Sequence, residues 1–204
     1  SSDLGKVFQC PVEELHVLLR GALLWAEDRR CATRAQQLDE GLAVWSGLLA
    51  GQPFSYAGEH WSVGPVTELA PPPPVQRPHP PVWCVGALRP RRQRQPSLDR
   101  AARWQGVLPA VVAGQEGHSG LTHESLDDLV RRLRGIREGL GLPWEGYDVV
   151  VEGDSHGGFG DIHDRPQSWA DQGATWWVES WWDLPDSPEG VDEVRRRVAA
   201  GPPR

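Results

Sequence analysis

Two stretches near the start of the chain repeat their apolar residues at helical spacing. Residues 12–30 carry a broad apolar stripe with charged residues opposite, formed by Leu15, Leu18, Leu19, Ala22, Leu23 and Trp25. Residues 34–50 place an apolar set on one side, made of Leu38, Leu42, Trp45 and Leu49, and Gly51 follows as a stop signal. The pattern predicts two amphipathic helices.

The next segment mixes aromatic residues, glycine and a long proline run. The sequence FSYAGEHWSV, residues 54–63, has aromatic residues on both sides of Gly58 and predicts a β-hairpin. The run APPPPVQRPHPPVW, residues 70–83, excludes helix, because proline lacks a backbone donor and restricts the residue before it. Such a run is often a free linker. Here it leads directly into the apolar VWCVGA, so we expect an extended, rigid lead-in to a buried strand.

From residue 82 onward, short apolar segments alternate with helical patterns. Strands are predicted near 82–86, 107–112, 147–152 and 174–179, and a helical segment follows each of them. This alternation favours parallel pairing with right-handed crossovers. We therefore expect four adjacent parallel strands in chain order.

Four of the eleven tryptophans fall between Trp176 and Trp182. The sequence ATWWVES, residues 174–180, has the aromatic and β-branched composition of a strand. Because apolar side chains occupy successive positions, we expect this strand to be buried on both faces, as in a parallel sheet covered by helices. Trp181 and Trp182 then fall in the loop after its carboxyl end, and Thr175 near its start is interpreted as structural.

Composition limits the class of protein. The chain has 204 residues, of which 39% are hydrophobic and 24% charged, as in ordinary globular proteins. A net charge of −7 argues against nucleic acid as a partner, because phosphate binding needs a basic face. No signal peptide is visible, and no apolar run approaches the roughly 20 residues of a membrane span. Scattered Cys10, Cys31 and Cys84 indicate free thiols in a reducing compartment, so we expect a cytoplasmic protein.

The composition is also biased. The chain has no Met and no Asn, and a single lysine, Lys6, stands against many arginines. Such a bias is typical of a GC-rich genome. The missing Met leads us to expect that an N-terminal piece has been lost or replaced.

Six phrases follow one another in a fixed order along the chain. They are RAQQLDEGLAVWSGLLAGQPFSYAGEHWSV, PPPVQRPHPPVWCVG, LDRAARWQGVLP, YDVVVEG, GATWWVES and GPPR. Together they resemble the luciferase-like monooxygenase family, the flavin- and deazaflavin-dependent oxidoreductases, which fold as (β/α)8 TIM barrels. The resemblance implies that residues 32–204 form a half-barrel similar to the family's C-terminal half, with about four β/α units, and that residues 1–31 are a helical segment unlike the family. Since a complete barrel takes about 250 residues, we expect an α/β fold of TIM-barrel type that is incomplete.

The resemblance also implies a cofactor site at the carboxyl ends of the strands, where barrel enzymes place their sites. The phosphate of FMN or of a deazaflavin coenzyme is expected beside the loop GALRPRRQRQP, residues 86–96, in which Arg94 is the fourth arginine. Arginine forks bind phosphate by charge-assisted hydrogen bonds, and glycine lets the backbone approach the ring. The implied cofactor-binding residues are Gly86, Ala87, Arg89, Arg91, Arg92, Glu179 and Trp181. The alternative interpretation is a solvated arginine loop.

The expected reaction is oxidoreduction of a small-molecule substrate, in which a reduced ring delivers hydride or reacts with oxygen. No residue of this half stands out as a proton donor, so no catalytic residue is assigned. Two positions depart from the family pattern near the expected flavin. The chain has Trp104-Gln105-Gly106 where many members have Trp-Asp-Gly, and Gly86-Ala87 where they have paired glycines.

A second polar segment, GDSHGGFGDIHD, follows the third strand. It collects imidazoles and carboxylates, the groups that bind metals, from Asp154, His156, Asp161, His163 and Asp164. The two histidines lie seven apart, which fits no firm ligand spacing. We therefore predict no metal site and interpret the segment as the rim of an active site or as a mobile loop. A metal hydrolase is a distant third reading of the chain.

The alternative to an enzyme is a non-catalytic remnant. A half-barrel leaves open sheet edges and an uncovered apolar face, which favour association. We therefore expect a homo-oligomer. Four further histidines are interpreted as exposed residues of helices or loops, namely His16, His60, His118 and His123.

Overall fold

The structure is a computed structural model that describes residues 31–67, 72, 74–112, 118–156 and 165–203. The chain divides into two compact units, Ser1–Pro80 and Pro81–Arg204. This division inside the proline run was not predicted from the sequence. The division proposed after residue 31 lies at the edge of the described residues, and the helix predicted at 12–30 lies outside them.

Unit 1 contains one helix and one hairpin. The helix α2 spans Cys31–Leu49, and β1 (Phe54–Ala57) pairs antiparallel with β2 (Ser62–Val66). Gly51, with a φ of 70°, follows the helix in the left-handed conformation that glycine favours. The second predicted helix and the predicted hairpin are therefore confirmed.

One carboxylate ties this hairpin to the helix. Glu40 of α2 accepts hydrogen bonds of 2.9 Å from the backbone N–H groups of Glu59, His60 and Trp61, in the turn of the hairpin. The indole of Trp61 returns a bond of 3.0 Å to the carbonyl of Gln37. Desolvation opposes ionisation of Glu40, but the three N–H donors outweigh it and hold its pKa below the usual value.

The proline run forms no helix in its described part, as predicted. It bends between residues 75 and 80, however, with a cis bond between Arg77 and Pro78, so the predicted extended course is wrong. The physical reason is that proline fixes its own φ and leaves ψ free, which allows a proline-rich run to change direction.

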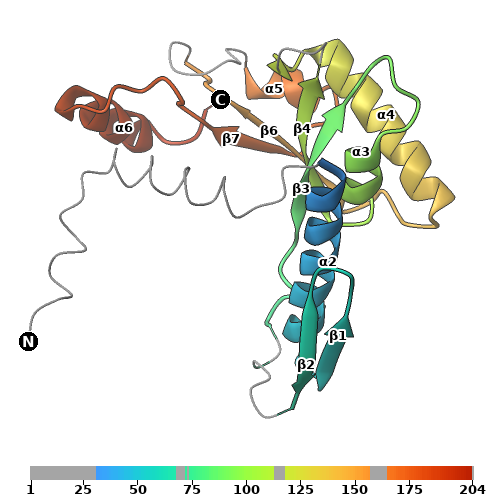
Figure 1. Cartoon of the computed structure of the whole chain (residues 1–204). Helices are drawn as coiled ribbons and strands as arrows, with labels where there is room; N and C mark the ends of the chain where they lie inside the picture. The colour runs from blue at the N-terminus through green and yellow to red at the C-terminus, as the bar shows by residue number, and fades with distance from the viewer. Residues whose placement is uncertain (1–30, 68–71, 73, 113–117, 157–164, 204) are drawn as a thin grey trace, which may run out of the picture. The chain divides into compact units, whose positions relative to one another are not determined.

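Unit 2 is built on a parallel sheet. Its strands are β3 (Trp83–Leu88), β4 (Gly106–Val112), β6 (Asp148–Gly153) and β7 (Trp176–Glu179), hydrogen-bonded in that order and all parallel. A two-residue strand, β5 (His118–Ser119), pairs antiparallel with β4. The predicted order and direction of the four strands are confirmed (Figure 1).

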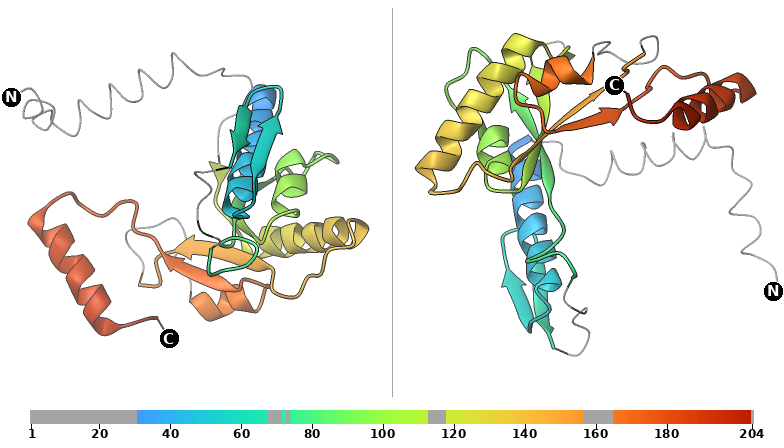
Figure 2. Two further views of the ribbon diagram at one scale, coloured as in Figure 1. Left: turned by 90° about the horizontal axis from the view of Figure 1, so that it is seen from below. Right: turned by 180° about the vertical axis from the view of Figure 1, so that it is seen from behind.

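A helix follows each parallel strand. They are α3 (Pro96–Ala101), α4 (His123–Gly139), α5 (Pro166–Ala170) and α6 (Pro188–Ala200). Both α3 and α4 lie side by side against β3 and β4 (Figures 1 and 2). The sheet and these helices bury a shared apolar core that includes Leu88, Leu98, Val107, Leu126, Leu129, Leu133 and Val149. None of the helices in the described ranges is long and apolar enough to cross a membrane.

A buried arginine joins α4 to the end of α3. Arg137 is only 7% exposed, and its Nη1 donates to the carbonyls of Ala102 at 2.7 Å and Trp104 at 3.1 Å. Its Nε donates to the carbonyl of Pro143 at 3.0 Å, and the guanidinium lies 4.4 Å above the ring of Tyr147. Burial lowers the pKa of Arg137 from its usual value. The arginine thereby satisfies carbonyls that the helix itself leaves unpaired.

The last strand differs from its prediction. Trp176 and Val178 of β7 are 50% and 36% exposed, so the expectation of a strand buried on both faces is wrong. Within the described residues β7 pairs only with β6 and β3 only with β4. Trp176 and Val178 are alternate residues and project from the same face of β7, so that face has no layer packed over it in the described residues.

One carboxylate nevertheless links β7 to the opposite edge strand. Asp148 accepts hydrogen bonds from the indole Nε1 of Trp83 at 2.9 Å and of Trp176 at 2.8 Å, one at each carboxylate oxygen. The two indole rings lie 5.4 Å apart. A Cβ on Gly106 would come within 2.5 Å of the Trp83 ring and 2.8 Å of Asp148, so a side chain there would displace them. This Trp–Asp–Trp clamp holds the amino ends of β3 and β7 together, while the strands fan apart toward their carboxyl ends (Figure 1).

Asp148→Asn is expected to lower the free energy of unfolding of unit 2 by about 1–3 kcal/mol. The amide keeps one acceptor for an indole N–H but presents a donor to the other indole. Urea unfolding followed by tryptophan fluorescence measures the loss. Asp171→Asn, at an exposed carboxylate that bonds only Gln167 among the described residues, is the matched control and should change little. Equal stability of both variants would contradict the clamp.

Candidate functional site

Two groups of polar residues follow the carboxyl ends of the parallel strands. The first is the arginine loop, residues 89–95, after β3. The second is the carboxylate cluster after β6 and β7, made of Asp154, His156, Glu179 and Arg197. Within the described residues no hydrogen bond or ion pair joins the two groups, which follow strands at opposite ends of the sheet order.

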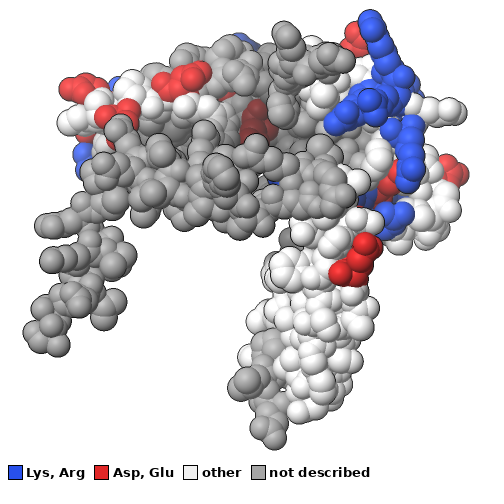
Figure 3. Space-filling view, viewed as in Figure 1, with Lys and Arg blue, Asp and Glu red and all other residues white. Residues whose placement is uncertain are grey.

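The arginine loop presents positive charge to solvent. Arg89, Arg91, Arg92 and Arg94 are all exposed, and their guanidinium groups make no hydrogen bond or ion pair to the described part of the chain. Positive side chains gather at the upper right of Figure 3, where Figure 1 places the loop between β3 and α3. The backbone is ordered by a turn in which the N–H of Arg92 donates to the carbonyl of Arg89 at 2.9 Å.

Gly86 and Ala87, near the end of β3, have structural roles. A Cβ on Gly86 would lie 2.5 Å from Val107 and 2.8 Å from Leu98, so the missing side chain lets α3 pack against the sheet. The backbone N–H of Ala87 donates to Ser97 Oγ at 3.1 Å, and that hydroxyl donates to the Ala87 carbonyl at 3.2 Å. Gly86 and Ala87 thus fix where the arginine loop begins.

Gln105 also has a structural role. Its side-chain oxygen accepts a bond of 3.1 Å from the N–H of Val82, and its own N–H donates to the Val82 carbonyl at 3.1 Å. The Gln105 carbonyl in turn accepts from the N–H of Asp148 at 2.9 Å. The residue therefore joins the starts of β3, β4 and β6.

A depression of about 310 Å³ lies beside the arginine loop. Its volume is at the lower limit of ligand pockets, about 300–1,000 Å³. Its lining combines arginines with one carboxylate and an apolar side chain, from Gln93, Arg94, Gln95, Asp99, Arg132, Gly135 and Ile136. Sequence reasoning missed Arg132, because no spacing along the chain connects α4 to this loop. It also missed Gln95 and Asp99, although both are close to the arginines in sequence.

The carboxylate cluster brings together two of the predicted site residues. Glu179 accepts one hydrogen bond from the indole of Trp177 at 3.0 Å and another from the indole of Trp181 at 3.2 Å. It also accepts the N–H of Ser155 at 3.3 Å. Glu179 and Trp181 are therefore bonded to each other. Trp181 and Trp182 lie beyond the end of β7, as predicted.

A buried ion pair forms the floor of the cluster. Asp154 is fully buried and accepts bonds from Arg197 Nη1 at 2.6 Å and from the N–H of His156 at 3.0 Å. Arg197 also donates to Glu193 at 2.6 Å and lies 5.1 Å above the ring of Trp181. Desolvation opposes the charge on Arg197, but the carboxylates of Glu193 and Asp154 raise its pKa above the usual value. The pair attaches α6 to the carboxyl end of β6.

The cluster also has partial metal-site geometry. Ligand atoms of Asp154, His156 and Glu179 all lie within 4.8 Å of one another. The Asp154 carboxylate, however, is already paired with the guanidinium of Arg197, and the Glu179 carboxylate already accepts hydrogen bonds from three N–H donors. A divalent cation would have to displace these donors and lie beside a positive charge, so the arrangement favours an internally paired network. The predicted rim residues Asp161, His163 and Asp164 lie outside the described residues.

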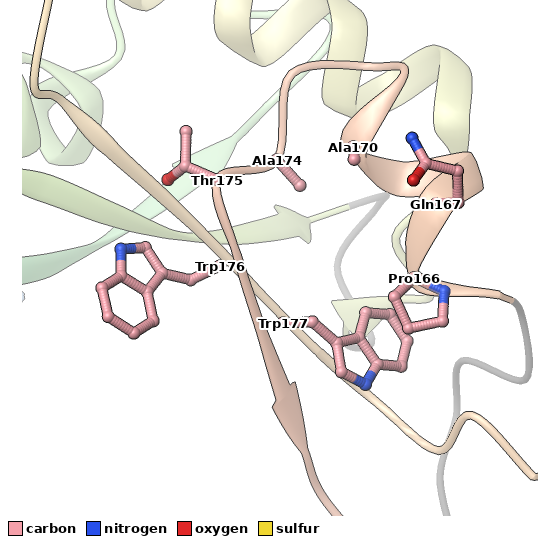
Figure 4. Close-up of a pocket in the computed structure, with 7 residues that line it drawn as sticks. All are labelled: Pro166, Gln167, Ala170, Ala174, Thr175, Trp176 and Trp177. Carbon is pink, nitrogen blue, oxygen red and sulfur yellow. The ribbon is translucent and has the colours of Figure 1, made fainter. Parts of the chain in front are cut away.

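The tryptophan-rich strand carries a smaller hollow at its amino end (Figure 4). It measures about 160 Å³, and Trp176 and Trp177 project on opposite sides of β7. That volume is below the range of ligand pockets, so the hollow has no room for an isoalloxazine ring. Thr175 lines it but also exchanges bonds with the Val149 backbone, which agrees with its structural interpretation.

Two of the histidines interpreted as exposed, His60 and His123, are half-buried. His123, at the start of α4, is half-buried, lies 3.1 Å from Ser168 Oγ and stacks at 4.2 Å on Trp169. It therefore links α4 to α5, a contact between distant residues that sequence spacing does not reveal. His60 bonds Gln36 in unit 1, whereas His16 and the side chain of His118 lie outside the described residues.

No protein-family model matches the chain. The likeness to luciferase-like monooxygenases accordingly rests on the six sequence phrases.

Arg197→Met is expected to lower the free energy of unfolding by about 3 kcal/mol, because it leaves the Asp154 carboxylate buried without its cation. Hydrogen exchange of the α6 amides should accelerate in the same variant. Arg195→Met is the matched control, since the Arg195–Asp192 pair is exposed and surface pairs contribute about 0–1 kcal/mol. If both variants lose the same small amount, Arg197 does not anchor α6.

Proposed function

We propose that unit 2 is the cofactor-binding part of a flavin- or deazaflavin-dependent oxidoreductase of luciferase-like type, with a TIM-barrel architecture. The arginine loop binds the phosphate of FMN or of a deazaflavin coenzyme. The observation that carries the proposal is the group of four exposed guanidiniums, unpaired within the described residues, directly after a parallel strand.

The charge balance supports a phosphate ligand. The chain carries a net charge of −7, and many of its arginines are paired with carboxylates, among them Arg131, Arg132, Arg195, Arg196 and Arg197. The arginine loop differs from single unpaired arginines such as Arg103 because it gathers four exposed guanidiniums within six residues, none paired with a carboxylate of the described residues. A phosphate dianion supplies the missing charge and accepts several N–H bonds at once. The donor set therefore fits the phosphate of a flavin coenzyme.

The carboxylate cluster supports the other end of the same ligand. Trp181 offers an aromatic face, and Glu179 is a carboxylate whose position is fixed by three donors. We propose that the ring of the cofactor extends toward these two residues. A bound flavin supplies hydride or oxygen chemistry, while the side chains orient it and exclude water. No residue is assigned as a proton donor.

Replacing Arg89 and Arg91 together by Ala is expected to weaken FMN binding by about 1.5–3 kcal/mol for each charged hydrogen bond lost. Quenching of tryptophan fluorescence by FMN measures the affinity of the full chain. Arg103→Ala removes an exposed arginine outside the loop and should change affinity by well under 1 kcal/mol. Unchanged affinity in the double variant, or a parent chain that binds neither FMN nor a deazaflavin coenzyme, would defeat the proposal.

The open edges favour a second candidate, a non-catalytic module that forms homo-oligomers without a cofactor. Val85 on β3 and Trp176 on β7 are 59% and 50% exposed, on the two strands that lack a second neighbour within the described residues. Exposed apolar strands at a sheet edge pair with other chains. Self-association is compatible with both candidates, whereas absence of flavin binding would favour this one.

Light scattering should report a dimer or larger species at micromolar concentration, since the edge strands need a partner. Val178→Lys places a charge on the edge strand β7 and should shift the protein toward the monomer. Val75→Lys is the control, because Val75 is fully exposed and lies in unit 1. A parent chain that scatters as a 22.6 kDa particle would rule out association through the sheet.

A further inference from the structure

At the end of β3, side chains form the backbone hydrogen bonds that a neighbouring strand would otherwise form. Ser97 bonds both the N–H and the carbonyl of Ala87, and Gln95 bonds both the N–H and the carbonyl of Arg89. In a parallel sheet alternate residues direct both backbone groups to the same side. Ala87 and Arg89 are alternate residues, so the two side chains cover one side of the strand where the arginine loop begins.

Gln95 makes the larger set of bonds. It is only 4% exposed, and its Oε1 accepts the N–H of Arg89 at 3.0 Å. Its Nε2 donates to the carbonyls of Arg89 and Arg92, each at 2.7 Å. Gln95, the last residue of the loop, thus bonds Arg89 and Arg92, and all three bonds go to backbone atoms of these arginines. Only a primary amide offers this acceptor and two donors from one group.

We propose that Gln95 is the positioning residue of the arginine loop and makes it a preorganised phosphate-binding loop. The inference rests on the proposed function and deepens it by naming the group that shapes the phosphate site. Gln95 itself contacts no ligand in this account. By fixing the loop backbone it removes the conformational entropy that binding would otherwise have to overcome.

A comparison with Ser97 distinguishes positioning of the arginine loop from coverage of the strand edge. It covers the neighbouring residue Ala87 with the same type of bonds but contacts no arginine of the loop among the described residues. Ser97→Ala should therefore disturb the strand edge and leave phosphate binding intact. Gln95→Leu should abolish phosphate binding.

Limited trypsin digestion of the full-length chain tests the proposal, with peptides cut after Arg91, Arg92 and Arg94 quantified by mass spectrometry. Without added anion, Gln95→Leu should be cut in the loop about tenfold faster than the parent, because three bonds that close the loop are lost. Gln93→Leu is the matched control: Gln93 is exposed in the same loop and makes no side-chain bond to the described residues. Gln95→Glu has the same size but lacks the two donors, so its loop should be cut as fast as that of Gln95→Leu. It replaces Gln95→Leu in the test when the leucine variant does not fold.

Inorganic phosphate is the probe for the binding half of the proposal. It should slow cleavage of the loop at least fivefold in the parent, in Gln93→Leu and in Ser97→Ala, with no protection in Gln95→Leu or Gln95→Glu. Protection of the Gln95 variants equal to the parent, or no protection of the parent, would overturn the inference. If phosphate protects the loop of the parent but the parent binds neither FMN nor a deazaflavin coenzyme, the proposed cofactor function is refuted and the role of Gln95 stands.

Discussion

The shape of the parallel sheet depends on one carboxylate that serves two indoles. Asp148 accepts Trp83 from the first strand of the sheet and Trp176 from the last, and Gly106 leaves the space in which the three side chains meet. Because the amino ends are drawn together, the carboxyl ends spread. The loops that follow β3, β6 and β7 are therefore distributed around the open end of the sheet, where parallel-sheet proteins bind their ligands.

The two polar groups at that end differ in whether their charged side chains are paired. In the carboxylate cluster, Arg197 and Asp154 neutralise each other in the interior, and indole and backbone donors satisfy Glu179. In the arginine loop only the backbone is satisfied, by Gln95, and the charges stay in solvent. A network that is already paired holds elements together, whereas an unpaired set of like charges has binding capacity for an anion. The contrast supports the proposal that the arginine loop binds an anion. The paired network attaches α6 and fixes Glu179 and Trp181, toward which the cofactor ring is proposed to extend.

Periodicity along the chain was sufficient to predict the elements that depend on local sequence. The strand–helix alternation predicted the four parallel strands, and the aromatic residues around Gly58 predicted the hairpin. The burial of β7 was predicted wrongly, since the side-chain pattern does not tell whether another layer packs over each face of the strand. Neither the clamp at Asp148 nor the stacking of His123 on Trp169 was predictable, because each joins residues far apart in sequence. Gln95 acts on residues close to it, and Pro96 after it marks the start of a helix, but nothing in the sequence shows that its amide bonds the loop backbone.

The central claim is that the arginine loop and the carboxylate cluster hold a flavin-type cofactor. The most direct measurement is the visible absorption spectrum of the full-length protein after incubation with FMN, or in parallel with a deazaflavin coenzyme, and removal of free cofactor by gel filtration. The account predicts cofactor absorption that elutes with the protein and approaches one cofactor per chain. A protein peak that stays colourless with both cofactors would contradict it.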